Sequence, residues 1–148
     1  MSEDSGAVPT PYVLDVSVVV AVARGDTDIM TFIQRLDGNG QPMVIPVLAI
    51  AAASLDARSE EADEFLAGLE LLGNAEVAPV SGSEQATRLA AVSARSGLDL
   101  WDAHVAAIAD ASVCPILTLD AAKWQQHAAD LDAPLHFVEI ADPGEDGS

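Results

Sequence analysis

Short apolar runs alternate with longer segments whose apolar residues recur at helical spacing, from near residue 12 to near residue 138. The apolar runs predict strands, and the segments between them predict helices. Strands are expected at residues 12–14, 43–45, 76–80, 116–119 and 135–138. Helices are expected over residues 17–24, 29–36, 46–57, 59–72, 81–96 and 99–111, with a further one around Trp124. This alternation predicts an α/β fold, a three-layer sandwich with a mainly parallel central sheet.

Acidic residues stand where several of these elements are expected to start or stop. Asp15 follows the first strand, and Asp120 follows the fourth. Asp99 is suited to cap the helix that begins after it, and Asp102 lies in the first turn, where the helix dipole favours an anion. Ligand sites in parallel sheets lie beyond the carboxyl ends of the strands. If the first and fourth strands are neighbours, Asp15, Asp102 and Asp120 converge on one crevice.

Each of these acids also has an ordinary structural explanation. Asp15 and Asp120 can each serve as a helix N-cap, and Asp102 can serve as a partner of the helix dipole alone. Their joint convergence favours a pocket for a divalent cation, because Mg²⁺ prefers oxygen ligands. The two interpretations predict different surroundings for the same three carboxylates.

The charge of the chain limits what it can bind. It carries 24 acidic residues against 6 basic ones, with a formal net charge of −18. Nucleic-acid binding draws on Lys and Arg at the phosphates, so a broad basic groove is excluded. Intrinsic electrostatic affinity for RNA is therefore expected to be weak, and RNA chemistry would depend on metal ions or a basic partner. The acid surplus also favours solubility.

The cysteine count and the lengths of the apolar runs indicate a location. Cys114 is the single cysteine, which excludes a disulfide framework within the chain and favours the reducing cytoplasm. Apolar runs stay shorter than the ~18 residues that a membrane span requires, so we expect no membrane association. Residues 1–148 are expected to form one domain, with short polar tails at about 1–10 and 141–148.

Three stretches of the chain have a familiar order and spacing: YVLDVSVVVAVARGD, VIPVLAIAAASL and LDLWDAHVAAIADASVCPILTLD. They resemble the PIN-domain family, especially the toxin ribonucleases of the VapBC type. The resemblance implies a parallel sheet with strand order 3-2-1-4-5. It also implies an acidic pocket that binds Mg²⁺ or Mn²⁺ and cleaves RNA, a homodimer, and a cognate antitoxin as partner.

Roles for single residues follow from the resemblance, position by position. Asp15, Asp102 and Asp120 match the family's metal-binding and catalytic acids. Ser17 matches the hydroxyl that supports the first acid, and Thr118 lies beside the last one. Asp99 is a candidate auxiliary ligand, although its position also suits an N-cap.

One position departs from the family pattern. Family members usually carry a Glu in the helix after the second strand, and Ala52 stands at that position here. Asp56 lies one helical turn later, roughly 6 Å further along the axis, and is a weaker substitute. Loss of the fourth acid should weaken a second metal ion most, because two-metal sites need bridging and flanking carboxylates.

Two functions are therefore expected to compete. The first is a divalent-metal-dependent ribonuclease, the toxin of a toxin–antitoxin pair, with reduced activity. The second is a catalytically degenerate PIN-like protein that acts as a binding or regulatory module. Ala52 and the shortage of basic residues motivate the second.

Overall fold

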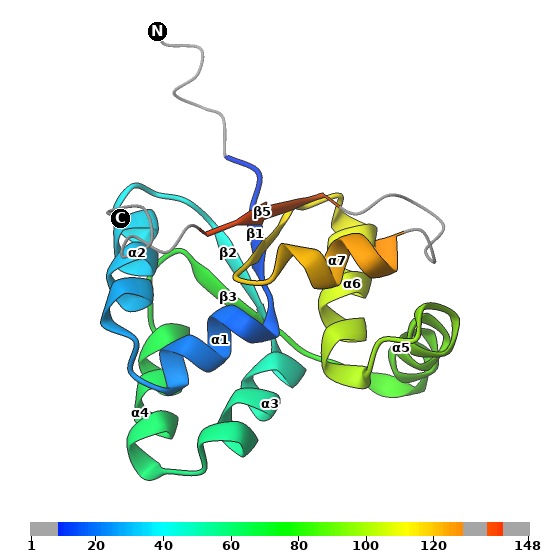
Figure 1. The fold of residues 1–148 in the computed structure, drawn as a ribbon, viewed down its shortest axis with the longest axis horizontal. Coiled ribbons are helices and arrows are strands. Elements are labelled where there is room, and N and C mark those ends of the chain that lie inside the picture. Colours follow the sequence, from blue (N-terminus) through cyan, green and yellow to red (C-terminus); the bar gives the residue numbers. More distant parts are fainter. Residues whose placement is uncertain (1–8, 129–135, 141–148) are drawn as a thin grey trace, which may run out of the picture.

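The computed structural model describes residues 9–128 and 136–140 (Figure 1). The elements follow one another in the predicted alternation. In chain order they are β1 (Tyr12–Leu14), α1 (Val16–Ala23), α2 (Thr27–Gly38), β2 (Met43–Pro46), α3 (Val47–Ala57), α4 (Glu60–Glu70), β3 (Ala75–Ala78), α5 (Gly82–Ser96), α6 (Leu100–Ser112), β4 (Ile116–Thr118), α7 (Ala121–Ala128) and β5 (Phe137–Glu139). Residues 1–8 of the expected tail at about 1–10, the expected tail at 141–148 and the expected strand start at Leu135 lie outside the described residues.

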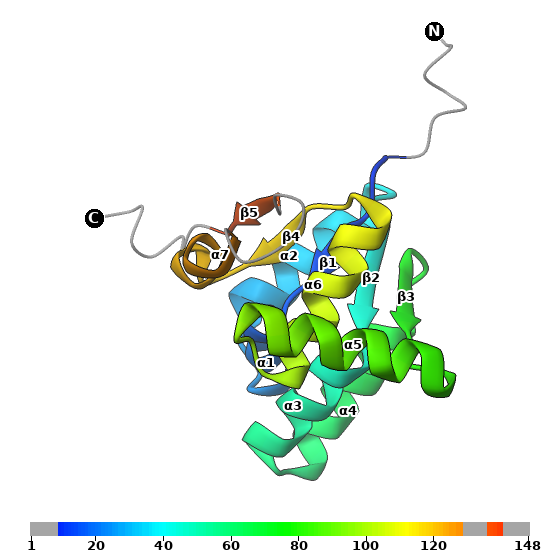
Figure 2. The ribbon, with the colours of Figure 1, turned by 90° about the vertical axis from the view of Figure 1, so that its right-hand side faces the viewer.

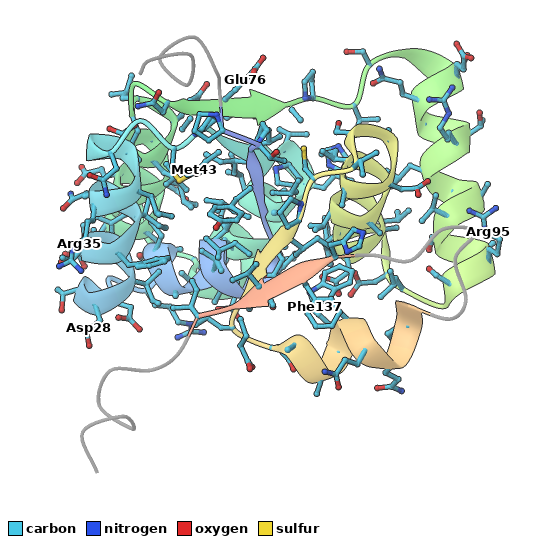
Figure 3. All side chains as sticks on the ribbon, turned by 90° about the horizontal axis from the view of Figure 1, so that it is seen from above. Asp28, Arg35, Met43, Glu76, Arg95 and Phe137 are labelled. Atoms are coloured by element: carbon cyan, nitrogen blue, oxygen red, sulfur yellow. The ribbon has the colours of Figure 1, made fainter. Side chains whose placement is uncertain are left out.

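The five strands form one parallel sheet in the order β3-β2-β1-β4-β5, which confirms the predicted order. β1 lies in the middle, where Val13 pairs with Val44 of β2 on one side and with Ile116 of β4 on the other. Figure 3 shows Glu76 of β3 and Phe137 of β5 at opposite edges of the sheet. The first and fourth strands are therefore neighbours, as convergence of the acids requires.

Consecutive residues of the central strands enter two different cores. Leu14 packs with the helices α1 to α4, whereas Val13 packs with α5 to α7. Ile116 and Leu117 of β4 divide between the two cores in the same way. Because successive strand side chains point to opposite faces, an apolar pair in each strand supports both layers of helices. Figures 1 and 2 show these layers, with α5 lying along the outside of α6.

The boundaries differ from the expected ones in a few places. Pro46 ends β2 and forms the N-cap of α3, instead of lying in the first turn of that helix. α2 continues through Gly38 into the stretch expected as a loop, and its last turn closes where the backbone N–H of Asn39 donates to the carbonyl oxygens of Arg35 and Leu36. β3 lies at 75–78, and β5 lies at 137–139 within the described residues.

The link between α6 and β4 is tight. Val113 closes α6 in the left-handed conformation, with φ of 54°, and its side chain is 71% exposed. Cys114 follows with its thiol buried, and its Sγ lies 3.5 Å from the carbonyl oxygen of Ser112. Burial raises the pKa of the Cys114 thiol. Cys114 therefore acts as a small core residue at this junction.

No helix among the described residues combines the length and apolar character that a membrane crossing demands.

Candidate functional site

Asp15 lies where β1 ends and α1 begins, and its side chain is fully buried. Its Oδ1 accepts hydrogen bonds from the backbone N–H of Val18, at 3.1 Å, and from the hydroxyl of Ser17, at 2.6 Å. Its Oδ2 accepts a hydrogen bond from the indole Nε1 of Trp124, at 2.9 Å. Both oxygens of Asp15 are thus bound by protein donors, one set from its own helix and one from α7.

Ser17 connects this acid to the neighbouring strand. Its hydroxyl donates to Asp15 and accepts a hydrogen bond from the backbone N–H of Leu119, at 2.9 Å. Leu119 directly follows β4, so one hydroxyl ties the start of α1 to the end of the adjacent strand. Sequence reasoning placed Ser17 beside Asp15, and the structure shows this contact.

Asp102 lies in the first turn of α6, which Asp99 caps by accepting the N–H of Asp102 at 3.0 Å. Oδ1 of Asp102 forms an ion pair with Nζ of Lys123, at 3.0 Å. Burial raises the pKa of the Asp102 carboxyl, the ammonium of Lys123 opposes that shift, and the charges of Asp99 and Asp15 add to it. The negative charges of Asp15 and Asp99 therefore act on the Asp102 carboxyl.

Asp120 has a different environment, because its side chain is exposed. Its Oδ1 accepts the backbone N–H of Lys123 at 3.3 Å, which caps the start of α7. Its own N–H donates to the hydroxyl of Thr118 at 2.8 Å, and Thr118 is fully buried. The contacts of Asp120 and Thr118 are those of a strand end that turns into a helix.

Lys123 and Trp124 are the site residues that sequence reasoning missed. They are consecutive in α7, and each donates to a different acid, Lys123 to Asp102 and Trp124 to Asp15. The ammonium of Lys123 also lies 5.3 Å from the centre of the Trp124 ring. The available signal was a cationic and an indole donor within four residues after Asp120, on a helix that begins at the acidic edge.

The two positions considered for the fourth acid add no carboxylate to these contacts. Ala52 is half-buried on α3 and offers a methyl group. Asp56 forms an ion pair with Arg24, at 2.6 Å, on the exposed surface. The Asp56 carboxylate therefore pairs with Arg24 and not with Lys123.

The carboxylates of Asp15, Asp102 and Asp120 each have partners within the described part of the chain. A metal ligand must offer an oxygen to the ion, and the oxygens of Asp15 already accept three hydrogen bonds within the protein. Asp102 holds an ammonium, and Asp120 caps a helix. Within the described ranges, no three His, Cys, Asp or Glu side chains are grouped closely enough to hold a metal ion.

A hollow of about 390 Å³ lies elsewhere, between β3, α5 and α6. It is lined mainly by apolar side chains, with His104 and Arg88 among the polar ones, and it includes none of the predicted acids. His104 is buried, and its Nδ1 accepts the backbone N–H of Leu48 at 3.4 Å. Burial lowers the pKa of His104.

The fold, with acids at the carboxyl edge of a 3-2-1-4-5 parallel sheet, defines a class of nuclease-like α/β domains. Residues 12–130 match the model of the PIN domain, and the chain belongs to this family. No curated protein sequence matches the chain significantly.

Solved structures share the fold at low sequence identity. VapBC2 from Rickettsia felis, bound to a DNA fragment from its promoter, matches with 17% identity and a TM-score of 0.58, over 87% of this chain and 98% of that one. DNA-bound VapBC from Salmonella typhimurium matches with 15% identity and a TM-score of 0.60, over 88% and 98%. PAE2754 from Pyrobaculum aerophilum matches with 20% identity and a TM-score of 0.55, over 88% and 86%.

Proposed function

We propose that this PIN-domain protein acts as a binding module whose nuclease centre is closed in its folded state. One observation carries the proposal: α7 supplies a donor to each of two family acids, Lys123 to Asp102 and Trp124 to Asp15. Together with Ser17 and the N–H of Val18, these donors engage both oxygens of Asp15 and Oδ1 of Asp102, to which a metal ion would otherwise bind. Ala52 stands where the family pattern has a further acid, so only Asp15, Asp102 and Asp120 of that pattern are present.

Phosphodiester cleavage by such a domain requires a deprotonated water and a stabilised leaving oxygen, which a bound metal supplies in nucleases. Here the buried carboxylates instead stabilise the fold. Asp15 caps α1 and joins it to α7, and Asp102 anchors Lys123. The same residue types that would bind a cation therefore have structural partners.

A basic protein is the partner class that the charge favours. The net charge of −18 repels the phosphates of RNA and attracts a cationic surface, which raises association rates. Two of the structural relatives are VapBC complexes, which contain an antitoxin. We therefore propose a basic, antitoxin-like protein as the partner. The homodimer expected from the resemblance remains a prediction, which light scattering at several concentrations would check.

The test of the closed centre is RNA cleavage by the purified protein. Single-stranded RNA would be incubated with the wild type and with Asp15→Ala and Asp102→Asn, in Mn²⁺, in Mg²⁺ and in EDTA. We expect the wild type to cleave no faster than the two variants in any of these conditions. Metal-dependent cleavage by the wild type that both variants lose would contradict the proposal.

A second function, the metal-dependent ribonuclease with reduced activity, has one observation in its favour. Residues 12–130 match the PIN domain, and Asp15, Asp102 and Asp120 stand at acidic positions of that family's pattern. Ala52→Glu separates the two functions. A large gain of Mn²⁺-dependent cleavage in that variant indicates a weakened nuclease, whereas an unchanged background supports the binding module.

A further inference from the structure

Lys123 is the single lysine of the chain, and it lies in the acidic site. Its ammonium is held on one side by Oδ1 of Asp102, at 3.0 Å, and lies 5.3 Å from the ring centre of Trp124. Only a quarter of the Lys123 side chain and 12% of the Asp102 side chain are exposed. Solvent and salt screen such a pair less than an ion pair on the open surface.

The backbone of α7 positions this lysine. Asp120 accepts the N–H of Lys123 and so fixes the first turn of the helix. Trp124, the next residue, is fully buried and bonded to Asp15, which prevents rotation of the helix. The direction of the Lys123 side chain toward α6 is therefore set by two anchors, one on each side of it in the sequence.

The acids around Lys123 need a positive charge. The Asp102 side chain is mostly buried, and Lys123 is the cation that pairs with it in the described part of the chain. A buried carboxylate without a cationic partner is strongly unfavourable. A divalent ion or an ammonium can each supply this charge, and the ammonium of Lys123 at 3.0 Å from Oδ1 of Asp102 repels a second cation at that carboxylate.

We propose that Lys123 is the resident counter-cation of this site and excludes divalent metal ions from Asp102. The proposal rests on the closed centre proposed above and explains what keeps it closed. Removal of the ammonium should then create a binding site for Mn²⁺ that the wild-type protein lacks. Trp124 contributes to the same effect, because its indole N–H donates a hydrogen bond to Oδ2 of Asp15.

The test measures metal binding without RNA. The melting temperature of Lys123→Met would be compared with and without millimolar Mn²⁺, alongside the wild type. We expect Mn²⁺ to raise the melting temperature of the variant by about 3 °C or more relative to its effect on the wild type. Isothermal titration with Mn²⁺ should show one added site.

Matched controls separate this effect from general attraction of Mn²⁺ to an acidic protein. Arg88→Met removes the same charge from an exposed pair with Glu84 and should respond to Mn²⁺ like the wild type. The double variant Lys123→Met with Asp102→Asn should lose the gain. An equal Mn²⁺ response in Lys123→Met and the wild type, or a gain that survives Asp102→Asn, would overturn the proposal.

A second measurement does not depend on the stability of Lys123→Met. Because Lys123 is the single lysine, limiting acetic anhydride should acetylate only this side chain and the N-terminal amine, and mass spectrometry distinguishes the two. We expect Lys123 to react several-fold faster in Asp102→Asn than in the wild type, with the N-terminal amine unchanged. Equal rates would show that Asp102 does not hold the ammonium.

The outcomes also separate this proposal from the proposed function. If Lys123→Met binds no Mn²⁺ and the wild type cleaves no RNA, only the role of Lys123 fails. If the wild type cleaves RNA with Mn²⁺ while Lys123→Met binds the ion more tightly, the closed centre fails and Lys123 remains a competitor of the metal.

Discussion

The indole Nε1 of Trp124 donates a 2.9 Å hydrogen bond to Oδ2 of Asp15, although 109 positions separate the two residues in the chain. Both side chains are fully buried. The bond fastens α7 to the junction of β1 and α1, in the middle of the sheet. The buried indole of Trp124 thus has a polar role at the acidic edge in addition to its packing.

Trp124→Phe should keep the aromatic packing and remove this donor. We expect the free energy of unfolding to fall by about 2 kcal/mol, because Oδ2 of a buried carboxylate would lose its partner. Urea denaturation followed by circular dichroism measures the change. Trp101→Phe is the control, since Trp101 is only half-buried and should cost less. An equal loss in both variants would show that the hydrogen bond contributes nothing beyond ring packing.

Ser17→Ala should destabilise the protein by about 2 kcal/mol. The substitution removes a donor to Asp15 and leaves the N–H of Leu119 without the hydroxyl that accepts it. Ser83→Ala offers a matched control, because Ser83 is exposed and its side chain forms no hydrogen bond within the described part of the chain. Thermal denaturation of the two variants should separate them by several degrees, and a Ser17→Ala midpoint equal to that of the control would contradict the expectation.

Val113→Gly should stabilise the protein by about 1 kcal/mol, because an L side chain in the left-handed region costs roughly 1–2 kcal/mol and Gly loses some of that gain through its greater freedom when unfolded. Val113 has φ of 54° and is mostly exposed, so little packing is lost. Val113→Ala keeps the Cβ and should gain less. Urea midpoints measured for the three proteins test this order, and a Gly variant no more stable than wild type would refute the strain.

His104 should make stability depend on pH. Its pKa is lowered by burial from an ordinary value of 6.5, so the unfolded chain binds the proton more readily than the folded one. Stability should therefore be full above about pH 7 and should fall as the pH drops below 6.5, by at most about 1.4 kcal/mol per pH unit from this group.

The measurement is the difference between wild type and His104→Gln in urea denaturation from pH 7.5 to 5.5. Burial raises the pKa of Asp102 and gives the opposite sign, a loss of stability as pH rises above about 3.8, so comparison with the variant isolates the histidine. A slope unchanged by His104→Gln would show that another group titrates.

The parallel sheet with helices on both faces was predictable, because short apolar runs separated by helical segments indicate strands buried on both sides. Val13 with Leu14, and Ile116 with Leu117, are adjacent apolar pairs, which a strand buried on both faces requires. The strand order came from the resemblance to PIN domains, and the sheet confirms it.

The site was harder to predict, because helix caps and metal ligands use the same residue type. The structure shows Asp15 and Asp99 as caps of α1 and α6, which composition and spacing had left open. The direction of Lys123 and Trp124 depends on how α7 packs against distant residues of β1 and α6. A contact between positions 102 and 123 is set by tertiary packing, which local pattern does not contain.

The buried thiol at the end of α6 has a practical consequence. Cys114 is the single cysteine, and its burial and raised pKa keep the reactive thiolate rare in the folded protein. Slow alkylation under native conditions would therefore report how often the junction of α6 and β4 opens. The alkylation rate of Cys114 would thus measure how often the structure beside the central strands unfolds locally, with no added label.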